Sequence, residues 1–299
     1  MHSVAGTLEA VEPFDFKKSL AFLAGFGPMS GQQGLDGSSV TKAIIVDGQT
    51  VAFRVKGQRS ELGYELFSRE PLSAKTVAEL EGRISFFLSL EDDLKPFYSL
   101  VKEKDPEFYP LVEMAWGLHH VKFLTFPEIA CWAVINQRIQ RPVALKIKQA
   151  ITERFGDKLE VGGKEYWAFP DQARLKAAKP RELLEATKNE RITKRISSLA
   201  SLFDELDEGF LRTALYEKAK ERLEKVYGIG EWSSMFILYR GFGRMGRLQP
   251  INVRPLQGEI KGLYESVKPL KEIDEVYGAW AGYWQLYLWA SRMDGFKSP

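Results

Sequence analysis

Apolar and polar positions near the start of the chain follow a period of two. Residues 41–46 and 50–55 are rich in β-branched side chains, and apolar residues recur at alternate positions of the second run. The pair Asp47-Gly48 between them is a turn signal typical of a β-hairpin. A further strand is predicted over 64–68, whereas 29–39, rich in Gly, Ser and Gln, predicts a loop.

Helical spacing flanks these strands and then takes over the chain. Asp15 is placed to cap a helix over 16–24, and Ser73 to begin another. From about Pro106 strand signals nearly vanish and helical spacing dominates; residues 157–167 are a short excursion from this pattern, with Gly162-Gly163 as a turn. Seven consecutive apolar residues predict a buried helix over 129–135 that ends at polar residues. Further helices are predicted over 142–155, 180–188, 191–206, 208–227, 231–241 and 272–292.

The two patterns together predict an α+β protein. Residues 1–105 are expected to form a small antiparallel β-rich N-terminal domain, and 106–299 an all-helical domain. The length of 299 residues is enough for two domains. With 44% hydrophobic and 12% aromatic residues, the chain can fill a sizeable core.

Composition excludes several classes of protein. No apolar run approaches the roughly 20 residues of a membrane span, and the N-terminus lacks the features of a signal peptide. We therefore expect a cytoplasmic protein. Cys131, the single cysteine, allows neither an internal disulfide nor a four-cysteine iron–sulfur cluster. His119-His120 has no spaced carboxylate partners, so we expect no metal site and interpret the pair as linker or surface residues.

The net charge of +2 does not by itself predict a polyanionic partner, so local clusters must be considered. Four arginines near the C-terminal end have no carboxylate between them: Arg240, Arg244, Arg247 and Arg254. A second basic cluster spans 174–195, but glutamates are interleaved with its basic residues. We interpret this second cluster as a solvated helical face.

The sequence Gly228-Ile229-Gly230 lies between two amphipathic helices. Two glycines separated by one residue predict a tight hairpin whose backbone N–H groups point outward at the start of the second helix. Such a site is suited to a phosphate, and a cation held by backbone carbonyls could assist it. The alternative is a plain turn between helices.

Several such pieces, in order, resemble the helix-hairpin-helix DNA glycosylase superfamily, and within it the 3-methyladenine DNA glycosylase II type. The similarity spans roughly 110–295, and the order and spacing of the pieces are more specific than any one of them. They are Phe126-Pro127-Glu128, Gln137, Phe155-Gly156, Phe169-Pro170, Gly228-Ile229-Gly230-x-Trp232, Pro250, Asn252, and a final helix with Trp280, Tyr283 and Trp289.

The resemblance implies a monofunctional base-excision-repair enzyme that flips alkylated purines out of DNA and hydrolyses their N-glycosidic bond. The substrates would be bases such as 3-methyladenine and 7-methylguanine, and the partner would be duplex DNA containing damaged bases. We expect a monomer without an iron–sulfur cluster, associated with the nucleoid in a prokaryote. No cofactor is expected beyond a structural monovalent cation that the hairpin could hold.

Asn252 stands where this family is expected to have its catalytic aspartate, two dozen residues beyond the first hairpin glycine. A carboxylate there stabilises the positive charge that develops at C1′ as the base leaves. Asparagine is uncharged and a poor base, and losing such a group costs about 3–4 kcal/mol. Three explanations stay open: an engineered exchange, natural loss of activity, or another carboxylate, such as Glu231 or Glu259, in its place. We favour the first two because the hairpin sets the geometry of the site.

Three aromatic residues match positions that line the base pocket in the alkylpurine branch: Trp232, Phe236 and Trp289. Electron-rich rings stack on a flipped base, although core packing is an equal interpretation for Phe236. Trp232 also stands where bifunctional members carry a lysine, which favours a hydrolase over a Schiff-base lyase. Ala290 replaces a frequent second aromatic residue and suggests a roomier pocket.

Gln137 and Arg138 match the position from which the family inserts side chains into the gap left by the flipped base. Gly228, Ile229, Gly230 and Arg254 complete the expected DNA-binding set. A second interpretation is a non-catalytic protein that recognises damaged DNA. A third, a helical protein unrelated to DNA, would be excluded by DNA binding that weakens steeply with salt.

Overall fold

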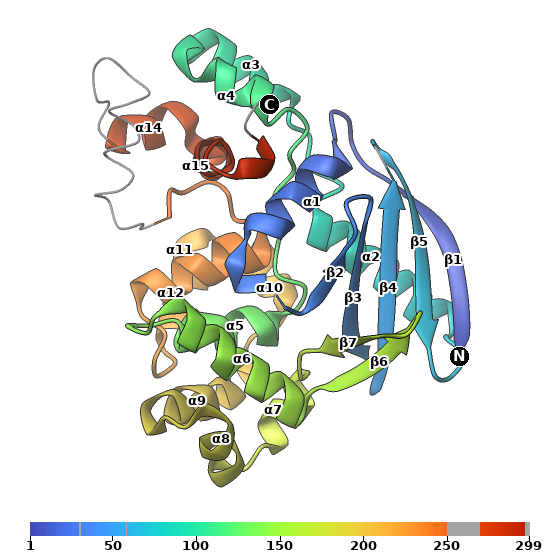
Figure 1. The fold of residues 1–299 in the computed structure, drawn as a ribbon. Helices are drawn as coiled ribbons and strands as arrows, with labels where there is room; N and C mark the ends of the chain where they lie inside the picture. Colours follow the sequence, from blue (N-terminus) through green and yellow to red (C-terminus); the bar gives the residue numbers. More distant parts are fainter. Residues whose placement is uncertain (30, 58, 250–269, 297–299) are drawn as a thin grey trace.

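The chain folds into one twisted sheet with helices packed beside it (Figure 1). A computed structural model describes residues 1–29, 31–57, 59–249 and 270–296. The sheet follows the order β1-β5-β4-β3-β7-β6, with β2 paired to β3 outside this path. The N-terminus begins in the edge strand β1, while the C-terminal helices lie on the far side of α1 from the sheet. The described chain is therefore a mixed structure of helix and sheet, as predicted.

The central hairpin forms as its sequence predicts. In β3 (Ser39–Val46) and β4 (Gln49–Gly57), Val46 pairs with Gln49 across the turn. Asp47 (φ 48°) and Gly48 (φ 77°) both adopt positive φ in that turn, which is the geometry that an Asp-Gly pair favours between antiparallel strands. The next strand, β5 (Glu61–Ser68), pairs antiparallel with β4 and contains the predicted run 64–68.

Four strands were not predicted. The edge strand β1 (His2–Glu9) pairs antiparallel with β5 along its whole length, and β2 (Gln33–Leu35) lies inside the predicted loop 29–39. The excursion after Pro106 is a hairpin, β6 (Asp157–Val161) and β7 (Lys164–Ala168), that returns to the sheet beside β3. The prediction that residues 106–299 are all-helical is therefore wrong at this hairpin. These strands are short or half-exposed, so the sequence carries little of the apolar alternation that would identify them.

Side chains cap the helices where the sequence places them. The Asp15 carboxylate accepts from the Lys17 N–H at the start of α1, and Ser73 accepts from the Thr76 N–H at the start of α2. The predicted helices over 208–227 and 272–292 are each divided into two. The α-helices are α1 (Phe16–Gly25), α2 (Ala74–Leu88), α3 (Lys95–Lys104), α4 (Tyr109–Met114), α5 (Phe126–Ile135), α6 (Arg141–Phe155), α7 (Gln172–Ala177), α8 (Pro180–Thr187), α9 (Glu190–Glu205), α10 (Glu208–Thr213), α11 (Tyr216–Glu224), α12 (Glu231–Phe236), α14 (Leu270–Tyr277) and α15 (Ala281–Ala290).

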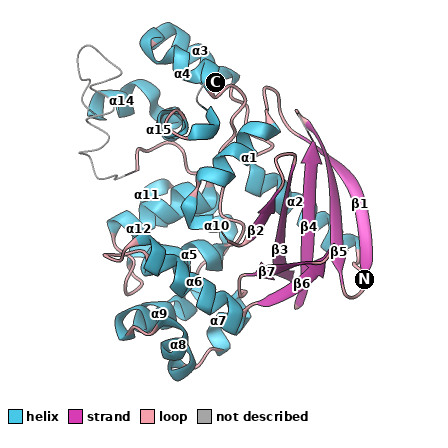
Figure 2. Ribbon diagram, viewed as in Figure 1, coloured by secondary structure: helices cyan, strands magenta, loops and turns pink. Residues whose placement is uncertain are grey.

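The helix α5 lies at the centre of the helical part. All ten of its residues are buried, and it packs against α6, α9 and the π-helical segment η3 (Ile237–Gly241), which continues α12. Figure 2 shows how the helices gather on one side of the strands. The main hydrophobic core runs from Phe53 in the sheet to Trp284 in α15, so it joins the sheet and the helices. None of the helices in the described part of the chain is long and apolar enough to cross a membrane.

The interpretation of His119 and His120 as linker or surface residues is wrong. Both side chains are fully buried. The His119 ring nitrogens lie 2.6 Å from the Ser89 carbonyl oxygen and 2.9 Å from that of Pro13, so the ring ties together segments distant in sequence. Two adjacent histidines are polar, and polarity alone does not show that backbone carbonyls will satisfy an imidazole in the core.

Candidate functional site

The hairpin between α11 and α12 depends on one of its two glycines. Gly228 has a φ of 94°, and a Cβ atom built there would lie 2.6 Å from Cγ of Arg195. Both the backbone angle and the close approach therefore require glycine. Gly230 has φ −104° and ψ −174°, with open space where a Cβ would stand. A side chain is therefore compatible with this second position, contrary to the expectation from the sequence.

The hairpin holds itself in place through its backbone. The Ile229 N–H donates to the Val226 carbonyl oxygen at 3.0 Å, and the Ile229 side chain is buried. The Ser234 N–H donates to the Gly230 carbonyl oxygen at 2.9 Å and closes the first turn of α12. The earlier N–H groups of that turn have no intrahelical acceptor, and they lie at the positive end of the helix dipole. The site can therefore receive an anion.

A cavity of about 460 Å³ separates this first turn from the end of α5. It brings together residues that are about ninety positions apart in sequence, among them three that the sequence predicted to contact DNA. The cavity is lined by Asn136, Gln137, Arg138, Gly230, Glu231, Trp232 and Ser233.

Gln137 is bound to the hairpin. Its Nε2 donates to the Gly228 carbonyl oxygen at 2.6 Å and to Oγ of Ser233 at 2.8 Å, and it lies 3.3 Å from the Ala133 carbonyl oxygen. The amide therefore fixes the end of α5 against the turn between α11 and α12.

Arg138, the next residue, is exposed and held in an unusual backbone conformation. Its φ of 57° lies in the left-handed region, which costs a residue with a side chain roughly 1–2 kcal/mol. Its side chain borders the cavity beside the hairpin. Gln137 is therefore held by hydrogen bonds to the hairpin, whereas the Arg138 guanidinium is exposed to solvent.

Two of the three predicted pocket aromatics, Trp232 and Phe236, belong to one connected group of rings. Trp232, which is 38% exposed, stacks on Phe236 with centroids 4.9 Å apart and an interplanar angle of 11°. The contacts continue from Phe236 to Phe123 and from Phe123 to Phe26, which follows the end of α1, at 6.2 Å each. The N-terminal part of the chain therefore contributes to the aromatic group, which the sequence did not indicate.

Arg240 connects Trp289 to the same group. Its guanidinium carbon lies 4.3 Å from the Phe26 ring centroid and 5.5 Å from that of Trp289. Arg240 is fully buried, and among the described residues its three guanidinium nitrogens have no hydrogen-bond partner. Burial lowers the pKa of Arg240 to about 10. Aromatic faces surround this cation in place of hydrogen-bond acceptors. The sequence did not predict this buried role for Arg240, because it showed only that the residue belongs to a basic cluster.

The other described arginines of that cluster are also engaged. Arg244 donates from Nη1 to the Leu211 carbonyl oxygen at 3.0 Å and from Nη2 to that of Ala214 at 2.8 Å. Arg247 forms ion pairs of 3.9–4.0 Å with Asp274 and Glu217. These side chains stabilise the helices around α10 and α14, so the described arginines of this cluster do not form a free basic patch.

The predicted catalytic position lies outside the described residues, as do Arg254 and Glu259. The last described residue before this position is Gln249, and it is fixed between two helices of the site. Its N–H donates to Oε1 of Gln285 at 2.8 Å, and its Nε2 donates to the Met235 carbonyl oxygen at 3.2 Å. The chain therefore leaves for residues 250–269 from between α12, which carries Trp232, and α15, which carries Trp289.

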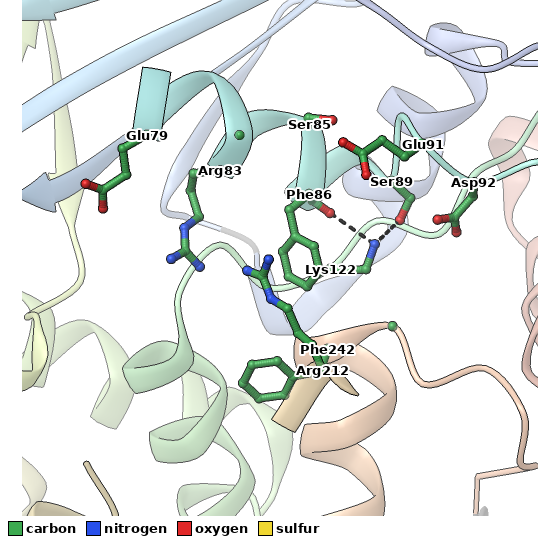
Figure 3. A pocket seen from close by; sticks show the side chains of 12 residues that line it. Glu79, Arg83, Ser85, Phe86, Ser89, Glu91, Asp92, Lys122, Arg212 and Phe242 are labelled. Atoms are coloured by element: carbon green, nitrogen blue, oxygen red, sulfur yellow. Dashed lines mark hydrogen bonds between the residues drawn. The ribbon is translucent and has the colours of Figure 1, made fainter. Parts of the chain in front are cut away.

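A second cavity, of about 510 Å³, lies beside α2 and is shown in Figure 3. Its most buried charged group is Lys122, whose Nζ donates to the Phe86 carbonyl oxygen at 3.0 Å and to Oγ of Ser89. Burial lowers the pKa of Lys122 to about 8. Across the cavity, Arg83 and Arg212 share the carboxylate of Glu208 at 2.7 and 3.1 Å. The lysine thus caps the carbonyl end of α2, and the cavity is a polar joint between α2 and the helical part.

Comparison with known proteins gives both a relative and a fold. No family model matches the chain. A DNA-3-methyladenine glycosylase of Bacillus subtilis is 28% identical over 264 residues, which cover 85% of this chain and 86% of that protein. A 3-methyladenine DNA glycosylase structure from Archaeoglobus fulgidus superposes with a TM-score of 0.75 at 20% identity and covers 96% of this chain and 98% of its own.

A third match is an 8-oxoguanine glycosylase/lyase of Clostridium acetobutylicum, in complex with double-stranded DNA. Its TM-score is 0.62 at 18% identity, and the superposition covers 87% of this chain and 97% of that one. The resemblance predicted from the sequence is therefore confirmed: the chain is similar in sequence to a 3-methyladenine DNA glycosylase and has the fold of the helix-hairpin-helix glycosylases.

Proposed function

We propose that this chain is a base-excision-repair DNA glycosylase that acts on alkylated purines in duplex DNA. The observation that carries the proposal is the sequence similarity to the Bacillus subtilis DNA-3-methyladenine glycosylase, which extends over 85% of the chain. The hairpin supports it, because a glycine-dependent turn presents unpaired N–H groups beside an exposed tryptophan. The Clostridium acetobutylicum neighbour was solved with double-stranded DNA, which supports duplex DNA as the partner.

We assign the predicted site residues distinct roles. Gly228 and Gly230 would place backbone N–H groups on a phosphate. Ile229, whose N–H already donates to Val226, would fix the shape of this turn, and Gln137 would hold the turn against α5. Arg138 would enter the gap left by the flipped nucleotide, because it is exposed whereas the Gln137 amide is already bound. Arg254 stays a proposed phosphate contact.

The base would stack in the aromatic group that contains Trp232, Phe236 and Trp289. Trp232 and Phe236 already stack on each other, so a planar base can continue this stack on the exposed Trp232 face. The absence of a lysine at position 232 supports simple hydrolysis, in which water attacks C1′, over an amine-dependent lyase reaction.

The proposed architecture keeps a division near residue 105, with a β-rich part before it and the helical part after it. The β6–β7 hairpin would be an extension of the helical part that returns to the sheet. We also propose that the protein acts as a monomer, because the hairpin, the cavity and the aromatic group all come from one chain.

A second candidate function is recognition of damaged DNA without catalysis, and Asn252 favours it. The amide can orient water but provides no negative charge opposite the developing oxocarbenium ion. Restoring a carboxylate should lower the barrier by about 3–4 kcal/mol, a gain of roughly 10²–10³ in rate.

The deciding experiment is single-turnover release of 3-methyladenine, 7-methylguanine or hypoxanthine from duplex DNA by the protein and by its N252D variant. Release that is much faster in N252D supports a glycosylase pocket whose key charge has been removed. Equal rates of release by both proteins would show that another carboxylate, such as Glu231, carries the catalytic charge. Binding without release in either would replace the proposal with damage recognition.

A further inference from the structure

The surface of α9 that faces the hairpin carries cations without carboxylate partners. Arg191, Lys194, Arg195 and Ser198 are spaced i, i+3, i+4 and i+7, so they share one face of the helix. An adjoining face of α9 is apolar and enters the core through residues such as Ile192, Ile196 and Leu199. The basic residues that the sequence assigned to an ordinary solvated face therefore have a fixed orientation.

Three contacts place this face against the hairpin. The Arg195 side chain packs against Gly228, the Nζ of Lys194 lies 4.8 Å from the Tyr227 ring centroid, and Oγ of Ser198 donates to the Tyr227 carbonyl oxygen at 2.6 Å. Tyr227 immediately precedes the first hairpin glycine. The helix and the turn thus form one continuous surface.

Arg138 joins this surface from the end of α5. Burial lowers the pKa of the Arg195 guanidinium, and the nearby charges of Arg191 and Arg138 lower it further. Within the described ranges, no carboxylate lies within ion-pair distance of Arg138, Arg191, Lys194 or Arg195. We call Arg191, Lys194 and Arg195 the α9 cations, and Arg138 borders them from the end of α5.

Neighbouring helices show that this lack of partners is local. Lys176 of α7 pairs with Asp204, and Arg181 of α8 pairs with Glu185 at 3.4 Å. On α11, Lys220 pairs with Glu224 at 2.9 Å. Like charges held together without counter-ions repel one another, and a polyanion relieves that repulsion.

We propose that the α9 cations form a second contact with the phosphodiester backbone of duplex DNA, continuous with the hairpin. This inference rests on the proposed function, because the hairpin must itself bind DNA. Phosphate is the matching chemistry: arginine and lysine neutralise it without reading a base, and the adjoining turn offers N–H groups for the same kind of group. The surface therefore anchors the duplex whether or not a damaged base is present.

The test is the salt dependence of binding to an undamaged duplex, followed by fluorescence anisotropy. The variant Arg191→Gln/Lys194→Gln removes two exposed α9 cations, and Lys176→Gln/Arg181→Gln removes two charges that are already paired. Each lost phosphate contact changes the slope of log K against log salt by about 0.9, so the first variant should lose about 1.8. Its affinity should fall at least roughly 10-fold at 0.1 M salt, while the second variant keeps the slope of the unmodified protein.

The outcomes separate the inference from the function on which it rests. If the unmodified protein binds with a steep salt dependence and the first variant keeps both slope and affinity, the α9 contact is wrong and the DNA-binding function stands. Equal losses in both variants would also overturn the inference, because they would reflect net charge alone. If the unmodified protein shows no salt-dependent binding, the proposed function fails and the inference fails with it.

Discussion

At the scale of single residues, the backbone of Arg138 combines strain with exposure. Its left-handed conformation is one that glycine adopts without cost. We therefore expect Arg138→Gly to raise the free energy of unfolding by about 1 kcal/mol, measured by urea denaturation, while weakening binding to duplex DNA. A gain in stability together with a loss of DNA affinity would show that Arg138 is retained for contact with DNA at the expense of stability.

Lys188 is the matched control for this change. It has a φ of 51° at the end of α8, away from the cavity beside the hairpin. The variant Lys188→Gly should gain similar stability with DNA affinity unchanged. A gain of affinity in Arg138→Gly, or an equal loss in both variants, would contradict the role of Arg138.

The arginines also show why the sequence predicted only part of the site. The hairpin turn and the aromatic positions could be recognised because each depends on a residue type at a fixed spacing. The environment of a cation depends on partners elsewhere: Arg240 is buried among rings from α1 and α15, whereas Arg191 faces the hairpin without a carboxylate. The described arginines of the cluster that looked free in the sequence are therefore engaged. In the cluster that looked balanced, Lys176 and Arg181 are paired, whereas Arg191, Lys194 and Arg195 have no described carboxylate within ion-pair distance.

At the scale of elements, α5 and α6 are joined by a buried ion pair. Nζ of Lys148 lies 2.6 Å from Oε1 of Glu128, and both side chains are almost fully buried. Burial opposes ionisation of Glu128, yet the charges of Lys148 and the buried Lys42 hold the pKa of this carboxyl below its ordinary value. One carboxylate therefore neutralises two buried lysines.

This asymmetry predicts unequal effects of mutation. Glu128→Gln leaves two buried cations without a counter-ion and should cost about 3–5 kcal/mol of unfolding free energy, measured in urea. Lys148→Met should lower the free energy of unfolding by less, because the Glu128 carboxylate still has Lys42 as a counter-ion. The exposed pair of Lys158 and Glu165 is the control, and Lys158→Met should cost less than about 1 kcal/mol. A larger loss in Lys148→Met than in Glu128→Gln would show that Lys42 does not share the carboxylate.

Element boundaries were predictable where a side chain marks them. Asp15 and Ser73 cap their helices, and Asp47-Gly48 turns its hairpin, because each feature is local in sequence. The strand β1 pairs with the distant β5, and the β6–β7 hairpin joins the sheet through Ala168, which pairs in parallel with Ala43, 125 positions away. Their own residues need only accept that pairing, so no strong local pattern identifies them.

At the scale of the whole molecule, two buried histidines lie where the N-terminal segments meet the helical part. His119 contacts carbonyl oxygens of Pro13 and Ser89, and the His120 ring lies 4.9 Å from that of Tyr239 in η3. Burial lowers the pKa of both histidines, and for His120 the charges of Arg240 and Lys122 lower it further. Protonation of either ring would place a new charge in this contact region.

The sign of the pH dependence follows from these shifts. The unfolded chain binds protons at histidine more readily than the folded chain does, so stability falls as the pH drops below the ordinary histidine pKa of about 6.5. Each buried histidine contributes a slope of up to about 1.4 kcal/mol per pH unit. The pKa values of Asp36 and Asp157 are lowered to about 2, so their stabilisation is lost only at more acidic pH, and the histidines dominate the range just below neutrality.

The variant His120→Phe tests this role. Neither ring nitrogen of His120 has a hydrogen-bond partner in the described part of the chain, so phenylalanine keeps the aromatic contact and removes two unsatisfied polar atoms. We expect a modest gain in stability at pH 8 that grows as the pH falls to 5, measured by urea denaturation at each pH. The exposed His2, changed to glutamine, should leave the profile unchanged. If the difference between His120→Phe and the unmodified protein stays constant across this range, His120 does not gain a proton on unfolding, and the acid sensitivity of the contact region must arise elsewhere.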